Sequence, residues 1–251
     1  MSDHRARLLP GRGLHGVAVA VAAAGLLGVT AVAGLTGCSA KSGSSSGNMT
    51  GMTARIGTFS ASQLRAALLT RVNGAGPATK PVAGSYGSIP EIQSAEKILG
   101  GAKVTPKQCM RATVLQAIML DTGALGSAPA AIVNFKVGTS GVSEVLVAPA
   151  DSATAASLAK PIPQSCAQYT AYSNGKAFRY TVQQSWVKGI GLQQARVLHI
   201  KTVGVKGNLW SLLYQGTGFV GTITVDGPSS TEAAVREIAK QAYDYAAKVL
   251  P

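Results

Sequence analysis

Apolar and polar residues alternate in several short segments over the second half of the chain, with the two-residue period of half-buried β-strands. Turn sequences lie between some of them: "GTSG" at residues 138–141 and Asn174-Gly175 are typical of hairpins. Seven segments carry the strand pattern, at residues 131–137, 143–149, 166–172, 177–184, 195–203, 208–215 and 218–225. Because short links join neighbouring strands, we expect an antiparallel sheet of about five to seven strands.

Helical periodicity predicts the elements that precede and interrupt these strands. Ser60 and Gln63 resemble a capping box, and Leu64, Leu68 and Val72 follow at helical spacing. Further helices are expected at residues 90–99, at 106–120, where Cys109 lies, and at 152–160.

The C-terminal segment has the clearest helical pattern. Residues from Ser229 to Glu232 resemble a second capping box. The apolar residues that follow fall on one helical face: Val235, Ile238, Ala242, Tyr245 and Val249. We expect this face to lie on the sheet, which gives an α+β fold with an antiparallel sheet packed by helices, the C-terminal helix among them.

The start of the chain has the pattern of an export signal. Residues 1–16 are polar and carry Arg5, Arg7 and Arg12, whereas residues 17–36 contain no charge. A basic segment followed by an apolar run is typical of secretory signals. An apolar run of about twenty residues is also long enough to span a bilayer as an uncleaved anchor, so length leaves both alternatives open.

The residues that end this run, Leu35-Thr36-Gly37-Cys38, resemble the lipobox of bacterial lipoproteins. The resemblance implies that a diacylglyceryl group is attached to the Cys38 thiol and that the chain is cut before it. Two acyl chains on one residue give stable attachment to a membrane. We therefore expect a signal peptide at residues 1–37, a Gly/Ser-rich tether at 38–57 and a single α+β domain at 58–251, anchored on the extracytoplasmic face of the cell membrane.

The assignment of Cys38 to lipid leaves an even number of cysteines. Cys109 and Cys166 remain, and a pair of cysteines in an oxidising compartment is expected to form a disulfide. Their spacing matches neither a C-x-x-C redox motif nor a zinc site, which indicates a structural bond.

The chain is strongly basic, with 23 Lys+Arg against 10 Asp+Glu and a formal net charge of +13. The basic residues are spread thinly, without the clusters and interleaved aromatics of nucleic-acid-binding proteins, so we expect no nucleic acid as a partner. A diffuse positive field favours acidic envelope polymers or anionic lipid headgroups, although simple solubility explains it equally well.

Catalytic chemistry finds little support in the sequence. His199 is the one histidine after the signal segment, it lies in a predicted strand, and no G-x-S-x-G motif accompanies it. "GTGFVG" at 216–221 joins two predicted strands and precedes no helix, unlike a phosphate-binding loop. We expect no enzyme activity, no metal and no cofactor. Eight aromatic residues of the strands either line a pocket or pack the core: Tyr169, Tyr172, Phe178, Tyr180, Trp186, Trp210, Tyr214 and Phe219.

Four segments together resemble the extracellular sensor domain of mycobacterial membrane Ser/Thr kinases and related mycobacterial lipoproteins of unknown function. They are "GSYGSIPEI" (84–92), the predicted Cys109 helix, "SCAQYTAY" (165–172) and residues 230–250. The resemblance implies a cleft for an unknown ligand and no enzyme activity. We therefore expect a non-catalytic, sensor-like lipoprotein that binds a lipidic or glycan ligand. The alternative is a structural lipoprotein that docks to an envelope protein or polymer.

Overall fold

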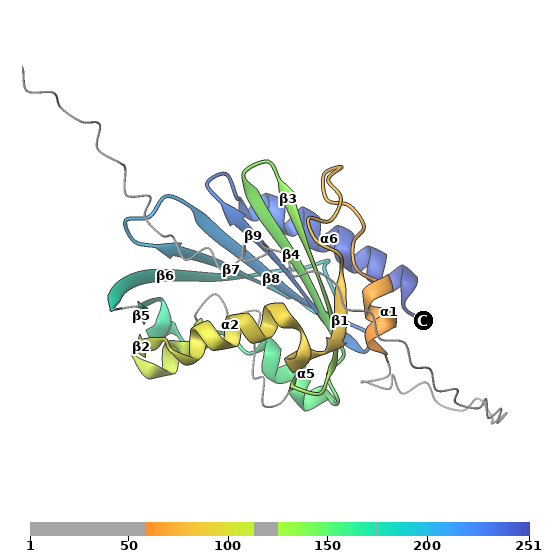
Figure 1. Ribbon diagram of the computed structural model, residues 1–251, viewed down its shortest axis with the longest axis horizontal. Helices are drawn as coiled ribbons and strands as arrows, with labels where there is room; N and C mark the ends of the chain where they lie inside the picture. Colours follow the sequence, from red (N-terminus) through yellow and green to blue (C-terminus); the bar gives the residue numbers. More distant parts are fainter. Residues whose placement is uncertain (1–58, 113–124, 174) are drawn as a thin grey trace, which may run out of the picture.

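The computed structural model describes residues 59–112, 125–173 and 175–251, which form an α+β domain around one antiparallel sheet (Figure 1). The strands are β1 (Val82–Ser85), β2 (Lys103–Thr105), β3 (Pro129–Val137), β4 (Ser140–Val147), β5 (Gln168–Ser173), β6 (Lys176–Val187), β7 (Ala195–Thr202), β8 (Asn208–Gly216) and β9 (Phe219–Gly227). They lie in the order β1-β3-β4-β9-β8-β7-β6-β5-β2. The helices are α1 (Ala61–Ala66), α2 (Pro90–Gly100), α5 (Ser152–Ala159) and α6 (Glu232–Val249), with 3-10 helices η2 (Tyr86–Ser88), η3 (Lys107–Ala112) and η4 (Gln164–Cys166).

The expected fold class is confirmed, but the expected number of strands is too low. The sheet has nine strands. The seven predicted strands are all present, and the two additional ones, β1 and β2, form the two edges of the sheet. They are four and three residues long, too short to show a two-residue period.

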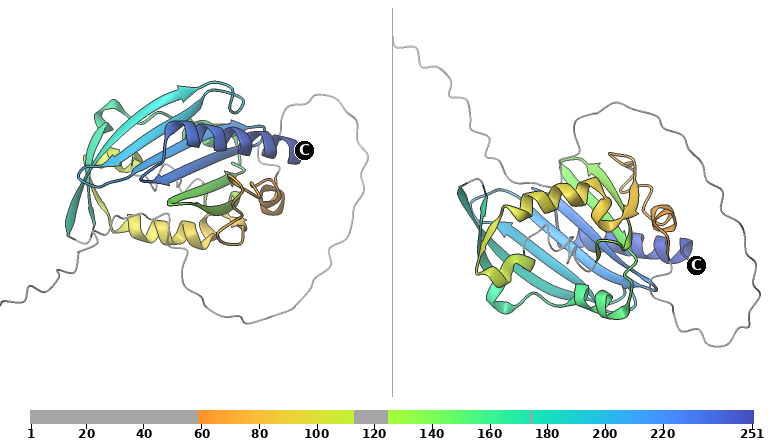
Figure 2. Two further views of the ribbon diagram at one scale, coloured as in Figure 1. Left: turned by 90° about the horizontal axis from the view of Figure 1, so that it is seen from above. Right: turned by 60° about the horizontal axis from the view of Figure 1, so that its bottom comes forward.

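One face of the sheet is covered by α6 and α1. The α6 side chains that face the sheet are Val235, Ile238, Ala239, Ala242 and Ala246. They pack in one core with Leu212 and Tyr214 of β8 and Ile223 of β9, while Leu64 of α1 joins the same core beside Val133 of β3. Seen from above, α6 lies along one side of the sheet and α2 along the other (Figure 2).

The opposite face carries two smaller cores. Ile92 and Ala95 of α2 pack with Ile132 of β3 and Val145 of β4. At the other edge, Cys109 of η3, Cys166 of η4 and Tyr169 of β5 pack with Val182 of β6. Between them Arg196 of β7 is buried and donates to the carbonyls of Leu158 and Lys160. A cation at these carbonyls satisfies the acceptors that α5 leaves unpaired at its C-terminus.

The predicted helix after Ser60 begins as expected but is much shorter. The capping box is present, since the Ser60 side chain accepts from the Gln63 N–H. The helix ends at Ala66, so Leu68 and Val72 are buried outside it. The chain instead turns back at Asn73 and Gly74, which both adopt positive φ angles of 49° and 81°.

Other predicted boundaries shift for local reasons. Of the helix expected at 106–120, a 3-10 helix forms over Lys107–Ala112, and residues 113–124 lie outside the described part of the chain. Cys166 belongs to η4, so β5 begins at Gln168.

The capping box expected from Ser229 to Glu232 is wrong in register. The N-cap of α6 is Thr231, whose side chain accepts from the Ala234 N–H. Val249, expected on the buried face, is 38% exposed, because the helix ends there and the chain leaves helical geometry at Leu250, which is buried in the core instead.

Candidate functional site

The two cysteines of the domain form the predicted disulfide. The sulfur atoms of Cys109 and Cys166 lie 2.07 Å apart, and their Cα atoms 5.2 Å apart. Both side chains are fully buried and join η3 to η4 beside the edge of the sheet formed by β2 and β5. The bond is thus structural. Cys38, the expected site of lipid attachment, lies outside the described residues together with the signal segment and tether, so these remain predictions.

His199 lies in β7 with its ring held on three sides. The ring stacks on Trp210, with centroids 3.8 Å apart and planes 2° from parallel. Its Nδ1 lies 3.3 Å from Oε1 of Gln183, and its Nε2 lies 3.1 Å from Oδ1 of Asn208. Burial lowers the pKa of His199, while the hydrogen bond to Asn208 opposes that shift. A neutral imidazole has one N–H, so one of the two amides must present its NH2 group to the ring.

These contacts make His199 a satisfied strand histidine. Its neighbours Leu198 and Ile200 are buried on the opposite face, as the strand pattern predicts. The polar partners of its ring are amides, whereas acyl-transfer chemistry needs a hydroxyl nucleophile on one side and a carboxylate on the other.

The eight aromatic side chains do not line a single pocket. Strand register divides them between the two faces, with Tyr172, Trp210, Tyr214 and Phe219 on the α6 side and Tyr169, Phe178, Tyr180 and Trp186 on the other. Tyr214 and Phe219 pack edge-to-face in the core under α6, with ring centroids 6.3 Å apart. Tyr169 and Tyr180 stack at 5.1 Å beside the disulfide. Core packing therefore accounts for most of this set.

The glycine-rich segment at residues 216–221 makes room for aromatic rings. It forms the turn between β8 and β9. A Cβ atom at Gly216 would collide with the Phe219 ring, and one at Gly221 would collide with the Tyr214 ring. These glycines are needed for packing, which agrees with the expectation that the segment binds no phosphate.

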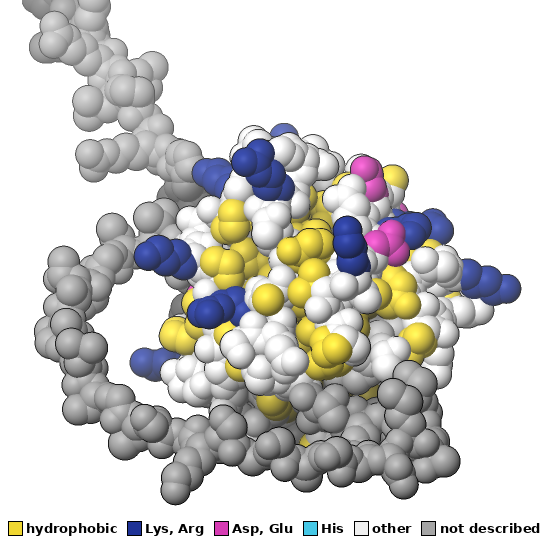
Figure 3. Space-filling model, turned by 90° about the vertical axis from the view of Figure 1, so that its right-hand side faces the viewer, with side chains coloured by type: hydrophobic (Ala, Val, Ile, Leu, Met, Phe, Trp, Pro, Cys, Tyr) yellow, Lys and Arg dark blue, Asp and Glu magenta, His cyan; other side chains and the backbone are white. Residues whose placement is uncertain are grey.

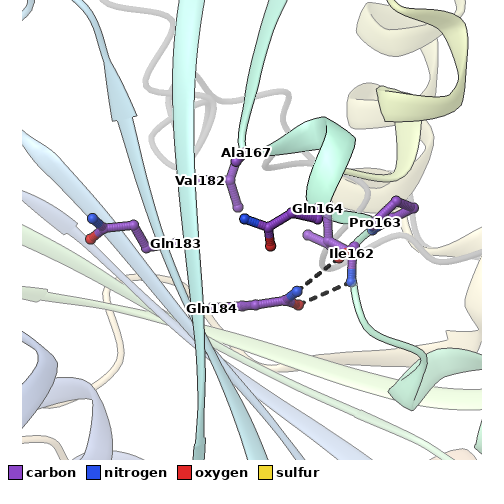
Figure 4. A pocket seen from close by; sticks show the side chains of 7 residues that line it. All are labelled: Ile162, Pro163, Gln164, Ala167, Val182, Gln183 and Gln184. Carbon is purple, nitrogen blue, oxygen red and sulfur yellow. Dashed lines mark hydrogen bonds between the residues drawn. The ribbon is translucent and has the colours of Figure 1, made fainter.

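A shallow pocket of about 270 Å³ opens beside β6 (Figure 4). It is lined by Ile162, Pro163, Gln164, Ala167, Val182, Gln183 and Gln184. The Gln184 amide donates to the Ile162 carbonyl at 2.7 Å and accepts from the Ile162 N–H at 3.0 Å. The Gln183 side chain points away from the others (Figure 4). Gln184 of β6 thus ties the loop at Ile162 to its strand. The pocket itself is open and lined by side-chain amides, and is not a closed apolar cavity.

Glu144 of β4 is a fully buried acid in the core under α1. Its Oε2 accepts from the Leu69 N–H at 2.8 Å, and its Oε1 has no hydrogen-bond partner in the described part of the chain. Burial raises the pKa of Glu144 to about 8, although the Leu69 N–H lowers it. Burial, together with the charge of Glu144, also raises the pKa of Tyr214 well above its ordinary value. Glu144 is therefore mostly protonated at neutral pH and fixes the chain that follows α1.

Within the part of the chain that the structure describes, about half of one sheet face has no helix packed on it. On this face α6 lies over β8 and β9, and α1 lies over β3, β4 and β1. A helix about 10 Å across covers about two strands at their usual spacing, so these two helices leave β5, β2 and the adjoining parts of β6 and β7 uncovered. Toward the other end of the same strands, Val187 of β6 and Ala195 and Val197 of β7 are buried in the core under α6. We give the name open face to the exposed and half-exposed side chains that strand register places on this side of the four strands and at the start of β8: Lys103, Thr105, Gln168, Thr170, Tyr172, Ala177, Arg179, Thr181, Gln183, Ser185, His199, Lys201, Asn208 and Trp210.

Strand register arranges the open face in rows across the sheet. Lys103 pairs with Tyr172, and Thr170 pairs with Arg179. Thr181 pairs with Lys201 in the next row. A further row runs from Gln183 through His199 to Trp210 and ends at the core under α6. Side chains directly opposite one another in paired strands lie about 5 Å apart, so each row presents adjacent polar groups.

The open face is positively charged. It carries three exposed cations, Lys103, Arg179 and Lys201, and none of its residues is acidic. Glu232, in the first turn of α6, lies near His199 but forms an ion pair with Arg236 at 3.5 Å. The face therefore offers hydroxyls, amides and cations to a ligand.

The open face was not among the features expected from the sequence, although the sequence of β6 carries a pattern that indicates it. Every second residue of β6 is polar from Arg179 through Thr181 and Gln183 to Ser185, which is the pattern of a solvent-facing strand surface. Among the described residues, no group of three or more potential metal ligands comes together. No helix within these ranges is long and apolar enough to span a bilayer.

Comparison with known proteins gives matches at the level of structure alone. No protein-family model and no curated protein sequence matches the chain. The extracellular domain of PknH from Mycobacterium tuberculosis matches with a TM-score of 0.51 and 15% sequence identity, over 76% of this chain and 97% of that one. An uncharacterized protein from Mycobacterium smegmatis, the Rv0999 ortholog, matches with a TM-score of 0.35 and 14% identity, over 68% of this chain and 85% of that one. The fold is therefore similar to that of the extracellular domain of a mycobacterial kinase, as the sequence resemblance implied.

Proposed function

We propose that this protein is a membrane-anchored extracytoplasmic lipoprotein whose domain binds an envelope ligand on the open face without catalysing a reaction. The open face itself is the observation that carries the proposal. A sheet surface of aligned hydroxyl, amide and cationic side chains, left without a covering helix, offers many hydrogen bonds over a broad area.

The geometry favours a polar ligand over a lipidic one. A lipidic ligand requires an enclosed apolar cavity, whereas the pocket that the described residues form beside β6 is open and contains three glutamines. Docking through an apolar surface would require a contiguous apolar patch. The exposed large hydrophobic residues instead come from separate parts of the chain: Tyr172, Trp186, Leu192, Val203, Val205 and Val249. A glycan-like polymer suits the open face best.

The comparison with solved structures supports the proposed extracytoplasmic location. The matching PknH domain is extracellular, and it shares its fold with this chain over 76% of the length. The lipobox resemblance at Cys38 adds an anchor on the same side of the membrane.

Hydroxyl-radical footprinting of the full-length protein tests the site. The probes are a solubilised envelope polysaccharide fraction and, separately, vesicles of anionic phospholipid. Polysaccharide should protect Tyr172, His199 and Trp210 on the open face. Trp186 is 46% exposed on the opposite face and serves as the internal control, which should stay reactive. Protection of Trp186 with unprotected Tyr172 and His199 would overturn the assignment of the site.

The substitution Cys38→Ala tests the anchor. The variant lacks the thiol that would carry the acyl chains, so we expect it to be found outside the membrane fraction or to remain as an uncleaved precursor. Fractionation and intact-mass analysis distinguish these forms. A variant that is cleaved and still membrane-bound would contradict a lipid anchor at Cys38, and an uncleaved wild-type protein would favour the signal-anchor alternative.

A further inference from the structure

We propose that the ligand of the open face is an acidic polysaccharide, bound at the end of the sheet that points away from the membrane anchor. This inference rests on the proposed function. Four cations define the surface, which we name the cationic end: Lys103, Arg179, Lys201 and Lys206.

The sheet brings these cations together from three strands and one loop. Lys103, Arg179 and Lys201 lie on the open face in β2, β6 and β7. The spacing of strands places β2 and β6 roughly 10 Å apart, with β7 a further 5 Å or so beyond. Lys206 lies in the loop that joins β7 to β8. The Val203 N–H donates to the Arg179 carbonyl at 2.8 Å and ties this loop to β6.

These side chains fit an extended acidic sugar polymer. No Asp or Glu lies among the exposed residues of β2, β5, β6 and β7, so a polyanion meets attraction along the whole width of the surface. Thr170 and Thr181 stand directly beside Arg179 and Lys201 and offer hydroxyls to sugar hydroxyls. Tyr172 is 42% exposed next to Lys103 and presents an amphipathic ring at the same edge.

The position of the tether favours a polymer over the membrane as the occupant. Phe59, the first described residue, packs against Phe219 with ring centroids 6.4 Å apart, beside the turn between β8 and β9. From that turn β8 runs nine residues to the loop that carries Lys206. At the usual rise of a strand this is about 30 Å. Figure 1 shows the same separation, with α1 at one end of the sheet and the β5–β6 hairpin at the other.

The end near the tether has a different surface. Figure 3 views the molecule from the side of α1 and the C-terminus, where apolar side chains reach the surface and acidic groups lie among the basic ones. Lys240 and Asp244 of α6, for example, form an ion pair at 2.7 Å. The cationic end thus differs from the surface close to the anchor in both charge and position.

Two matched triple variants of the full-length protein test the inference. The first removes charge at the cationic end by Lys103→Gln, Arg179→Gln and Lys201→Gln. The control removes the same charge elsewhere by Arg65→Gln, Lys188→Gln and Lys248→Gln, at exposed sites of α1, the end of β6 and the end of α6. Polygalacturonate is the acidic probe and dextran the neutral one, with binding measured by calorimetry at two salt concentrations and folding checked by circular dichroism.

We expect the first variant to bind polygalacturonate about tenfold more weakly than wild type, because several exposed charge contacts of modest strength are lost together. The control should change by less than about twofold, and added salt should weaken the wild type. Equal losses in both variants would show attraction to net charge alone and overturn the inference. Binding of wild type to anionic vesicles but not to polygalacturonate would overturn it in favour of a membrane. If polysaccharide protects the open face equally in wild type and in the first variant, the ligand is not recognised by its acidic groups. This result would refute the further inference but not the proposed function.

Discussion

At the scale of single residues, Glu144 makes folding depend on pH. Its pKa is about 8 in the fold against 4.5 for an ordinary glutamate, so the folded state binds a proton more tightly than the unfolded state. Folding therefore takes up a proton between these values, and the free energy of unfolding falls as pH rises through this window. Each unit of pKa difference corresponds to about 1.4 kcal/mol, so the loss amounts to several kcal/mol.

Replacement of Glu144 by Gln should remove this dependence. The amide keeps an acceptor for the Leu69 N–H and carries no charge, so Glu144→Gln should match wild type near pH 4.5 and exceed its stability at pH 8. Urea unfolding at both pH values measures the difference. Glu237→Gln, an exposed change on α6, is the matched control and should leave the pH dependence of wild type unaltered. If the free energy of unfolding of Glu144→Gln falls between pH 4.5 and pH 8 as steeply as that of wild type, Glu144 is not the source of the pH dependence.

The sequence predicts some residues well because their surroundings are local. The disulfide follows from a count of three cysteines, and the environment of His199 follows from the strand that carries it. Glu144 could not be predicted, since both alternating sets in its strand are apolar around it, with Val142 and Leu146 on one face and Val145 and Val147 on the other. Only the packing of α1 against β4 shows that this carboxyl is buried.

At the scale of elements, the N-terminus of α6 offers a direct test of the corrected cap. Thr231 accepts from the Ala234 N–H at 3.2 Å, so Thr231→Ala should lower the free energy of unfolding by about 1 kcal/mol. Ser229 begins the capping box expected from the sequence but caps no N–H of the helix, so Ser229→Ala should have little effect. Thermal and urea unfolding of the two variants show which residue caps the helix. A larger loss of stability in Ser229→Ala than in Thr231→Ala would instead support a cap at Ser229, as the sequence pattern suggests.

Helices and strands were predicted correctly where the pattern of apolar and polar residues repeats several times within the element. Strands of eight to twelve residues show several alternations, and α6 repeats its apolar face over 18 residues. Short elements were predicted poorly. The three-residue strand β2 was not expected at all. Helix α1 ends after six residues because the Leu69 N–H donates to Glu144 instead of continuing the helix. The partner in that hydrogen bond is 75 residues away in the sequence, beyond the reach of any local pattern.

At the scale of the whole molecule, the open face results from the arrangement of helices. Sequence periodicity identifies α6 and its apolar side, but every strand from β3 to β9 offers a similar partner for it. Helix α6 packs on β8 and β9 for two reasons. Gly221 leaves space for the Tyr214 ring on this part of the sheet. The small side chains Ala239, Ala242 and Ala246 allow the helix to lie close to the strands. The candidate site is the remainder of that face, and so it becomes visible only when the sheet is assembled.

The proposed lipid anchor at Cys38 predicts how the whole molecule is oriented on a membrane. The proposed tether, residues 38–57, would span roughly 25 Å as a flexible linker, similar to the length of β8. Because the described domain begins at Phe59 beside the β8–β9 turn, a fluorophore on Thr217→Cys should transfer energy to a lipid-bound acceptor more efficiently than one on Val205→Cys. Both sites are exposed, and the buried disulfide leaves the native domain cysteines unlabelled. The measurement uses the lipidated protein on zwitterionic vesicles. Equal or reversed efficiencies would contradict an outward-facing cationic end, because Val205 stands beside Lys206 and would then approach the bilayer as closely as the tether does.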